Sequence, residues 1–226
     1  MFCYTSGTTG DPKAAMLTHK NLTSAASNIF LINGIQILED DIMISYLPLA
    51  HSFEKVLFTA ALLVGVSIGY YSGDPLKLLD DLAELKPHFF PSVPRLFNRI
   101  YDKILAGIKA RGPAAVALFN RAVSGKLRHL NTKATYNHTF WDNIFFNRMR
   151  ALLGGRVKMM VTGSAPISPE VLSFLKVCFC CPILEGYGQT ESSAASCMTS
   201  PFDPVAGHVG GPLSSLRIRL KDLPEM

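Results

Sequence analysis

The sequence has few charged residues, and its lysines and arginines are scattered rather than clustered. Charged residues make up 17% of its 226 residues and hydrophobic residues 48%, a balance that allows a sizeable buried core and disfavours disorder. The formal net charge is +5, and no basic run is interleaved with aromatic residues. A nucleic-acid-binding function is therefore disfavoured, whereas an anionic substrate or a membrane surface is compatible with the mild positive charge.

The sequence also lacks the signals of a structural zinc site and of secretion. Three of its five cysteines crowd together at Cys178, Cys180 and Cys181, without a second Cys/His group at zinc-finger spacing. We therefore expect small buried hydrophobic side chains in a reducing compartment. Residues 1–20 have neither the charged nor the apolar segment of a secretory signal, so a secreted protein is not expected.

An uncharged stretch from Val56 to Gly73 approaches the length of a membrane span. Gly65 and Gly69 interrupt it, its first half has the composition of a helix, and Val66–Tyr71 has that of a strand. The stretch therefore predicts a buried helix, a turn and a strand rather than a membrane span.

Strand-like and helix-like segments alternate along the chain. Strands are predicted at Ile42–Tyr46, Val66–Tyr71, His88–Val93, Val157–Val161 and Ile183–Leu184. Helices are predicted at Asn21–Ile32, from Ser52 to Gly65, at Pro75–Leu85, from Pro94 onward, at Phe140–Leu153 and at Pro169–Val177. This alternation predicts an α/β fold with a layered, mostly parallel sheet flanked by helices. The period-two pattern of Leu216–Leu220 predicts a half-exposed strand that starts an antiparallel piece.

A polar loop near the start of the sequence is the strongest functional signal. It comprises Thr5, Ser6, Gly7, Thr8, Thr9 and Gly10 and leads through Asp11 and Pro12 to Lys13. Its glycines let the backbone approach a ligand, its amides and hydroxyls can donate to phosphate, and Lys13 adds a positive charge. The spacing is not that of a Walker loop, and the apolar flanks predict a strand–loop–strand hairpin. A phosphate-binding loop is predicted, with a polar surface turn as the alternative.

Two further loops follow predicted strands of the sheet. Residues 162–168 follow one strand and are small, so a planar ring could lie against their backbone. Residues 185–191 follow another strand and combine two glycines, a tyrosine, a threonine and a carboxylate. Ligands of open parallel sheets collect beyond the carboxyl ends of the strands, which is where both loops are expected. Alone, each loop reads as an ordinary strand-to-helix turn; together with the first loop they predict a nucleotide site.

Taken together, these three loops resemble the signature of the adenylate-forming superfamily, which contains acyl-CoA synthetases, luciferases and peptide-synthetase adenylation domains. Residues 47–54 (LPLAHSFE) and 91–101 (PSVPRLFNRIY) are similar to long-chain fatty acyl-CoA synthetases in particular. The resemblance extends over essentially the whole chain.

The resemblance implies roles for individual residues. It implies that Thr5–Gly10 and Lys13 hold the pyrophosphate end of ATP and that Tyr187 stacks on adenine. It also implies that Thr190 contacts the α-phosphate and that Glu191 holds Mg²⁺, with Thr5 as a second metal ligand. The other residues that it places at the nucleotide are Gly163, Ser164, Ala165, Glu185, Gly186 and Gly188.

A second group of residues has weaker assignments. By the resemblance, His51 lies at the acyl and CoA side, although a lone histidine is as often structural. Arg95 and Arg99 lie one helical turn apart and either meet phosphate or acidic partners or form a solvated helix face. Phe53, Phe58 and Leu62 offer one helix face to an acyl chain, with ordinary core packing as the alternative.

The resemblance also implies an activity and a domain organisation. The expected reaction uses ATP and Mg²⁺ to convert a long-chain fatty acid to acyl-AMP, from which CoA displaces AMP. Residues 1–226 would form an incomplete AMP-binding domain: a phosphate-loop hairpin (1–17), an α/β subdomain (18–200) and the start of a β subdomain (201–226). The family's C-terminal domain would be absent, so this chain alone is expected to have little or no turnover.

The expected location follows from the family as well. Full-length members work at the cytosolic face of the endoplasmic reticulum or at mitochondrial outer or peroxisomal membranes, so a membrane surface is an expected partner and nucleic acid is not. Two alternatives stay open: another adenylate-forming ligase acting on medium-chain or aryl acids, and a catalytically inactive truncated product. Acyl chain length and oligomeric state are not indicated by the sequence.

Overall fold

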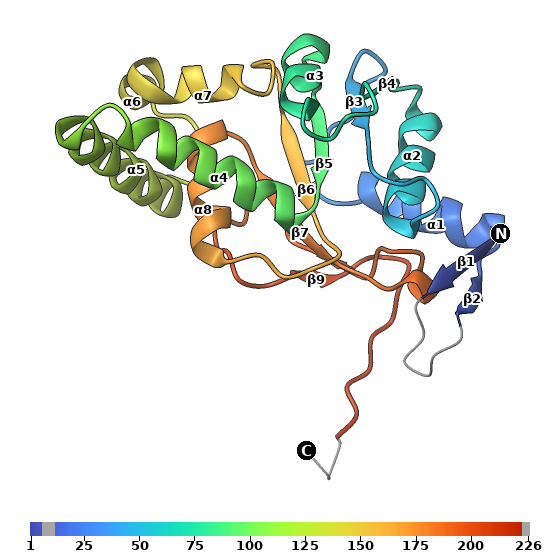
Figure 1. Cartoon of the computed structure of the whole chain (residues 1–226). Helices are drawn as coiled ribbons and strands as arrows, with labels where there is room; N and C mark the ends of the chain where they lie inside the picture. Colours follow the sequence, from blue (N-terminus) through green and yellow to red (C-terminus); the bar gives the residue numbers. More distant parts are fainter. Residues whose placement is uncertain (6–11, 223–226) are drawn as a thin grey trace.

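A mixed β-sheet lies at the centre of the fold (Figure 1). The computed structural model describes residues 1–5 and 12–222, and seven strands of this part form the sheet in the order β4-β3-β5-β6-β7-β8-β9. The first five strands of that order are parallel, and β8 and β9 are added in antiparallel orientation. The predicted α/β fold, with a mostly parallel sheet flanked by helices, is confirmed, whereas the antiparallel strands are formed by other residues than the predicted Leu216–Leu220.

The strands of the central sheet are short and separated by helices. They are β3 (Ile42–Ser45), β4 (Ser67–Tyr70), β5 (Phe89–Ser92), β6 (Met159–Thr162), β7 (Ile183–Tyr187), β8 (Cys197–Met198) and β9 (Gly211–Pro212). The helices are α1 (His19–Phe30), α2 (Ser52–Val64), α3 (Leu78–Leu85), α4 (Pro94–Lys109), α5 (Pro113–Lys133), α6 (Thr139–Trp141), the π-helix η1 (Asp142–Phe146), α7 (Asn147–Ala151), α8 (Pro169–Phe179) and the 3₁₀-helix η2 (Thr190–Ser192).

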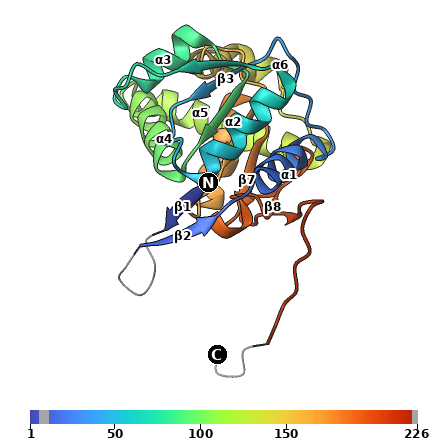
Figure 2. The ribbon, with the colours of Figure 1, turned by 90° about the vertical axis from the view of Figure 1, so that its right-hand side faces the viewer.

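Each face of the sheet carries its own hydrophobic core. Helices α1 and α2 cover one face, and α3, α4, α5 and α8 cover the other (Figures 1 and 2). Alternate residues of a strand point to opposite faces, so Met159 and Val161 of β6 pack towards α1 and α2 while Met160 packs towards α4 and α8. The predicted role of the cysteines is confirmed, because all five are free and buried.

The outer helices are specified by local signals. At α1, the Thr18 hydroxyl accepts a hydrogen bond from the Asn21 amide at 3.1 Å, which caps the helix. Helix α4 begins with Pro94, a residue suited to the first helical position, and buries Phe97, Ile100, Ile104 and Ile108 on one stripe.

Three predicted elements differ from the structure. Helix α3 begins at Leu78 rather than Pro75, because the Asp74 side chain accepts from the Leu76 amide (2.9 Å) and forms a turn first. The single helix predicted at Phe140–Leu153 is divided into α6, η1 and α7. The strand predicted at Leu216–Leu220 is not formed; that segment extends away from the body (Figure 1), and no strand of the described residues pairs with it.

The uncharged stretch between Val56 and Gly73 forms most of α2, the Gly65 turn and strand β4, as predicted. Gly65 ends α2 with φ 81°, a conformation that glycine adopts readily. Within residues 1–5 and 12–222, the structure contains no helix with the length and apolar character needed to cross a bilayer.

A two-stranded hairpin lies apart from the central sheet. Strands β1 (Phe2–Thr5) and β2 (Lys13–Met16) pair antiparallel, with Thr5 opposite Lys13. The predicted strand–loop–strand arrangement around the polar loop is therefore confirmed, while Ser6, Gly7, Thr8, Thr9 and Gly10 lie outside the described residues.

Candidate functional site

Two adjoining cavities lie beyond the carboxyl ends of the parallel strands. The first has a volume of about 340 Å³ and is lined by Ser164, Ala165, Pro166, Glu185, Gly186, Tyr187, Gly188 and Val209. We call it the planar cavity, because backbone of two short loops and the ring of Tyr187 line it together. The second and third predicted loops, which are far apart in the sequence, thus line the same cavity. Pairing of β6 with β7, in which Thr162 lies opposite Glu185, holds the two loops side by side.

The second cavity, which we call the central cavity, has a volume of about 180 Å³ and shares Ser164, Gly186 and Gly188 with the planar cavity. It reaches from β7 to the start of α2. Its other lining residues are Ile29, His51, Ser52, Phe53, Val56, Leu57, Val161, Thr162, Gly163, Gln189, Thr190, Ala194, Ala195, Cys197 and Met198. Because the two cavities share walls, one extended ligand could occupy both.

Small residues are required where the loops approach each other. A Cβ atom on Gly163 would lie 3.3 Å from the Gly186 carbonyl oxygen, and a Cβ atom on Gly188 would collide with the Ala194 carbonyl. Ser164 has φ 71°, a strained conformation for a residue other than glycine. The loop backbone is therefore packed to a shape that leaves room for a ligand but little for side chains.

Tyr187 presents an aromatic surface to the planar cavity. The residue is 46% exposed, and its hydroxyl accepts a hydrogen bond from the Gln189 side chain at 2.9 Å. This bond fixes the edge of the ring and leaves the ring available for stacking against a flat ligand.

The short helix η2 carries the polar end of the third loop. Its first turn is held by reciprocal bonds between Gln189 and Ser192, in which the Gln189 amide donates to the Ser192 hydroxyl at 3.1 Å. Thr190 lines the central cavity, and Glu191 is exposed on the helix. Strand β2 packs against η2, so the hairpin that carries Lys13 lies beside this loop.

The ends of the first loop are joined to each other. The Thr5 hydroxyl donates to the Lys13 carbonyl at 3.2 Å, and the Lys13 side chain is exposed. Neither residue lines the planar or the central cavity; they reach the site through the contact between β2 and η2.

His51 has a structural contact in addition to its place in the cavity wall. Its Nδ1 atom accepts a hydrogen bond from the Phe53 amide at 3.2 Å and caps α2, and the residue lines the central cavity. The geometry therefore gives His51 both a helix-capping contact and a position in the wall of the central cavity.

An apolar cavity of about 40 Å³ adjoins the central cavity and shares Ile29, Leu57, Val161 and Met198 with it. The face of α2 that lines these two cavities differs from the predicted one: Phe53 contributes, but Leu62 is 62% exposed and Phe58 lines neither. The residues of α2 that take part are Phe53, Val56, Leu57, Ala60 and Ala61. Ile29 and Met198 were missed, because nothing local in the sequence marks them as neighbours of α2.

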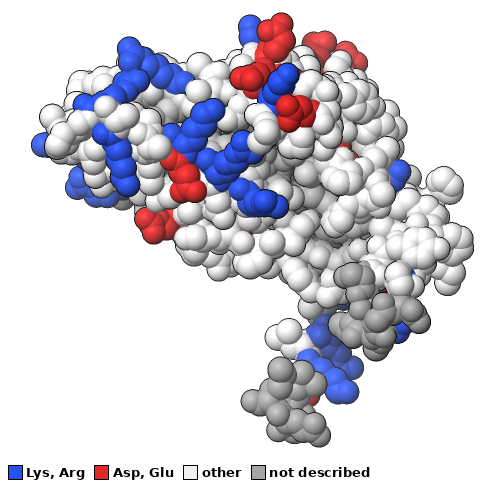
Figure 3. Space-filling view, viewed as in Figure 1, with Lys and Arg blue, Asp and Glu red and all other residues white. Residues whose placement is uncertain are grey.

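The basic residues singled out on α4 are exposed. Arg95, Arg99 and Lys103 repeat every four residues on its outer side and form no ion pair within the part of the chain that the structure describes. Lys and Arg side chains gather over this region of the surface in Figure 3. This is the arrangement of a solvated helix face, and it lies outside both cavities.

Two carboxyl groups at the carboxyl edge of the sheet are buried with one oxygen unpaired among the described residues: Glu54 Oε2 and Glu185 Oε2. Burial raises the pKa of Glu185, although His208 and Lys176 act in the opposite direction. Burial also raises the pKa of Glu54, although the Ser45 hydroxyl donates to its Oε1 at 2.5 Å. Unpaired buried polar atoms of this kind mark sites of strain or function.

The raised pKa of Glu54 gives a pH-dependent term in stability. Because the folded state holds this proton more tightly than the unfolded state, the stabilising term is fully present below the unfolded pKa and is lost as pH rises through the folded pKa. We expect the wild type to lose free energy of unfolding relative to Glu54→Gln over that window, by at most about 1.4 kcal/mol per pH unit. Urea titrations across pH, with Glu84→Gln on the exposed face of α3 as control, measure this difference; parallel curves for wild type and Glu54→Gln would contradict it.

The fold and the cavities define an α/β protein with a composite ligand site at the carboxyl edge of a parallel sheet. A family model described as AMP-binding enzyme matches residues 1–226, and the chain belongs to this family. The solved N-terminal domain of FACL13 from Mycobacterium tuberculosis, bound to an inhibitor, superposes with a TM-score of 0.63 at 20% identity, over 94% of this chain and 43% of that one.

Curated relatives are more similar in sequence. The chain is 46% identical to the peroxisomal long chain acyl-CoA synthetase 6 of Arabidopsis thaliana, over 99% of this chain and 32% of the relative. It is 44% identical to human long-chain-fatty-acid–CoA ligase 1, over 100% of this chain and again 32% of the relative. The chain thus spans about a third of the length of the curated relatives it matches.

Proposed function

We propose that this chain is the nucleotide-binding part of a long-chain fatty acid–CoA ligase. In the proposed reaction, a fatty-acid carboxylate oxygen bonds to the α-phosphorus of ATP and pyrophosphate leaves. The CoA sulfur then bonds to the acyl carbon, AMP leaves and the thiol proton passes to solvent. The observation that carries the proposal is the meeting of two separate loops around the planar cavity, with the hairpin of the polar loop beside them. The names of the curated relatives support the choice of substrate.

The proposed nucleotide site uses both cavities. Adenine occupies the planar cavity, against the ring of Tyr187 and the backbone of Gly186, with its other face towards Ser164 and Ala165. Aromatic stacking on a base contributes about 1–3 kcal/mol. The other residues proposed to contact the nucleotide are Gly163, Glu185 and Gly188. Thr5–Gly10 and Lys13 are proposed to bind the pyrophosphate. Thr190 lines the central cavity, and its proposed role is to donate to the α-phosphate.

The proposed acyl site begins at the apolar cavity next to the central cavity, whose volume of about 40 Å³ admits only the first carbons of the chain. Its walls are hydrophobic side chains of α1, α2 and the sheet, the surroundings that favour a hydrocarbon chain. A carboxylate at the mouth of this cavity would lie in the central cavity, near His51 and Thr190. This arrangement brings the reacting carboxylate to the α-phosphate by positioning alone.

The proposed Mg²⁺ ligands are Glu191 and Thr5. Their oxygen atoms are the hard donors that Mg²⁺ prefers. Thr5 lies opposite Lys13 in the hairpin, and strand β2, which carries Lys13, contacts η2, which carries Glu191. When bound, the ion would neutralise charge on the phosphates. Lys13 supplies a further positive charge at the pyrophosphate end, which stabilises the leaving group.

The full-length protein is proposed to act at a membrane surface, on the cytosolic side of the endoplasmic reticulum, the mitochondrial outer membrane or the peroxisome. The peroxisomal relatives from Arabidopsis thaliana support the last of these. Its proposed partners are a long-chain fatty acid, ATP and CoA. Fractionation of cells that express the tagged full-length protein tests this location.

ATP binding is the direct test of the proposal. We expect ATP with Mg²⁺ to raise the melting temperature of the chain, because a ligand that binds the folded state stabilises it. Lys13→Ala should weaken ATP binding about tenfold, or about 1.4 kcal/mol, through loss of a cation at the pyrophosphate. Calorimetric titration of both proteins measures this loss, and Lys133→Ala, an exposed lysine at the end of α5, serves as a control for net charge. Equal ATP affinity in the Lys13 and Lys133 variants would argue against the assigned phosphate loop.

The identity of the acid substrate needs the complete protein. Adenylate formation measured over a panel of long-chain, medium-chain and aryl acids should favour the long-chain acids. A preference for aryl or short acids would replace the fatty-acid assignment with another adenylate-forming activity.

A further inference from the structure

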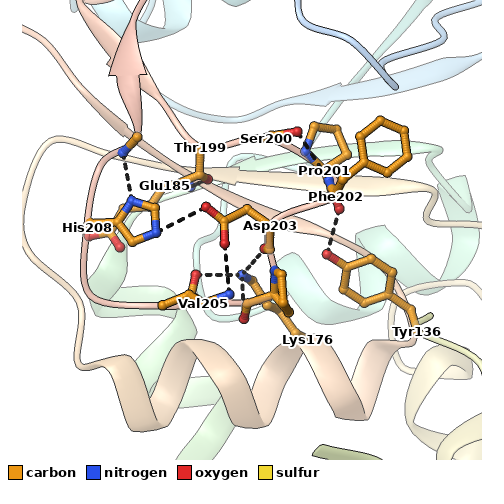
Figure 4. A network of polar contacts seen from close by, with 12 residues as sticks. Tyr136, Lys176, Glu185, Thr199, Ser200, Pro201, Phe202, Asp203, Val205 and His208 are labelled. Atoms are coloured by element: carbon orange, nitrogen blue, oxygen red, sulfur yellow. Dashed lines mark hydrogen bonds and ion pairs between the residues drawn. The ribbon is translucent and has the colours of Figure 1, made fainter. Parts of the chain in front are cut away.

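Lys176 of α8 is a buried cation that contacts only backbone carbonyls among the described residues. The residue is 2% exposed, and its ammonium group donates to the carbonyl oxygens of Asp203 (3.2 Å), Val205 (3.4 Å) and Pro204 (3.5 Å) (Figure 4). An ammonium group has three N–H donors, and these three consecutive carbonyls satisfy all of them.

This environment is costly for a charged group. Burial lowers the pKa of Lys176, while the more distant charges of Asp203 and Glu185 act in the opposite direction. Within residues 1–5 and 12–222, no carboxylate forms an ion pair with its ammonium group. A leucine or methionine would fill a similar space without this cost.

The three carbonyls belong to a segment that further polar contacts hold in shape. We call Asp203–Val209 the rim segment. The Asp203 carboxylate accepts from the Val205 amide at 3.0 Å and pairs with His208 Nε2 at 3.2 Å, and His208 Nδ1 accepts from the Gly210 amide at 3.1 Å (Figure 4). Lys176 anchors the middle of this network to α8.

The rim segment forms part of the planar cavity. Val209 lines that cavity directly. Glu185 also lines the cavity, and the charge of His208 in the rim segment opposes the rise in the Glu185 pKa that burial causes. No rim residue lines the central or the apolar cavity among the described residues.

We propose that Lys176 is a positioning residue for the nucleotide: its buried ammonium group holds the rim segment against α8 and so fixes the outer wall of the planar cavity. Lys176 does not touch the ligand; it acts through Val209, the rim residue that lines the cavity. This inference rests on the proposed function, because it assigns the planar cavity to the purine. It predicts a selective effect, since the rim segment borders one of the three cavities.

The test compares Lys176→Met with the wild type by hydrogen exchange and calorimetry on the whole chain. Methionine keeps the length of the side chain and removes the three donors. We expect amide exchange at Val205 and Gly210, whose amides donate to the Asp203 and His208 side chains, to rise at least about tenfold, because the segment loses its anchor. ATP should bind about tenfold more weakly, whereas the affinity for a long-chain fatty acid should stay unchanged. Lys176→Arg should restore part of both losses, and Lys103→Met, on the exposed side of α4, should change neither.

The outcomes separate this inference from the proposed function. If the wild type does not bind ATP, the proposed function fails and the inference fails with it. If the wild type binds ATP and Lys176→Met binds it equally well, only the inference is overturned. Equal weakening of ATP and fatty-acid binding would indicate a general structural role and would also overturn it. If Lys176→Met does not fold, Asp203→Ala replaces it in the test. This variant removes the partly exposed carboxylate within the rim segment, and it must show the same selective loss of ATP affinity.

Discussion

Replacing Gly188 with alanine is expected to lower ATP affinity at least about 100-fold, or about 2.7 kcal/mol. Gly188 lines both the planar and the central cavity, and a Cβ atom there would overlap the carbonyl of Ala194. The obstacle is backbone rather than a flexible side chain, so the loop itself must move. Ser193 and Ala194 already have positive φ angles of 56° and 66°, which leaves them little freedom to adjust.

Calorimetric titration with ATP measures this effect, and a melting curve shows whether the chain stays folded. We expect a loss of stability of about 1–3 kcal/mol, the range for overpacking at a tight position. Gly211→Ala is a matched control near the same edge of the sheet, because a Cβ atom there would have no neighbour within 4 Å. If the ATP affinity of Gly188→Ala is within threefold of that of Gly211→Ala, the loop tolerates the added methyl group. In that case the close approach of Gly188 to the Ala194 carbonyl does not determine the shape of the site.

The fold could be predicted from the sequence because its signals are local. Strands β3, β6 and β7 are short apolar runs between helices with clear starts, such as Pro94 at α4. Their parallel arrangement then places the loops after β6 and β7 at one edge, where the structure brings them together around the planar cavity. The order of elements along the chain was sufficient for this step.

Other features depend on contacts between distant residues. The apolar residues of Phe140–Leu153 repeat with the period of one α-helix, but the structure has a π-helix from Asp142 to Phe146. The buried carboxylate of Asp142 contacts Lys126 on α5 at the start of this π-helix. The rim segment likewise depends on Lys176, which lies 27 to 29 positions before the carbonyls that it contacts. A sequence pattern read within one helix shows neither contact.

The cap formed by His51 was difficult to predict for a different reason. The predicted start of α2 at Ser52 is confirmed, but its cap was not predicted. The preferred capping residues are serine, threonine, asparagine and aspartate, and histidine is not among them. In the structure Ser52 is the first helical residue and is buried, and the imidazole takes the capping position. The side chain thereby becomes part of the cavity wall, and its helix-capping contact fixes where the wall begins.

The largest loss of stability is expected from Lys126→Met. The ammonium group of Lys126 contacts Asp142 Oδ1 at 2.5 Å and the Cys180 sulfur at 2.9 Å, and it lies 4.5 Å from the centre of the Phe146 ring. The side chains of Lys126 and Asp142 are 1% and 10% exposed. Removing the cation leaves a buried carboxylate without its partner, which costs about 3–5 kcal/mol of the free energy of unfolding. Urea denaturation measures this loss.

A double-mutant cycle separates the charge from the packing. Lys126→Met combined with Asp142→Leu removes both charges, so the double variant should regain most of the stability that Lys126→Met loses. Lys133→Met, on the exposed last turn of the same helix, should change the free energy of unfolding by less than about 0.5 kcal/mol. If the stability loss of the double variant equals the sum of the losses of the two single variants, the two side chains act independently. The buried pair would then not explain why the Phe140–Leu153 region is held against α5 at Asp142.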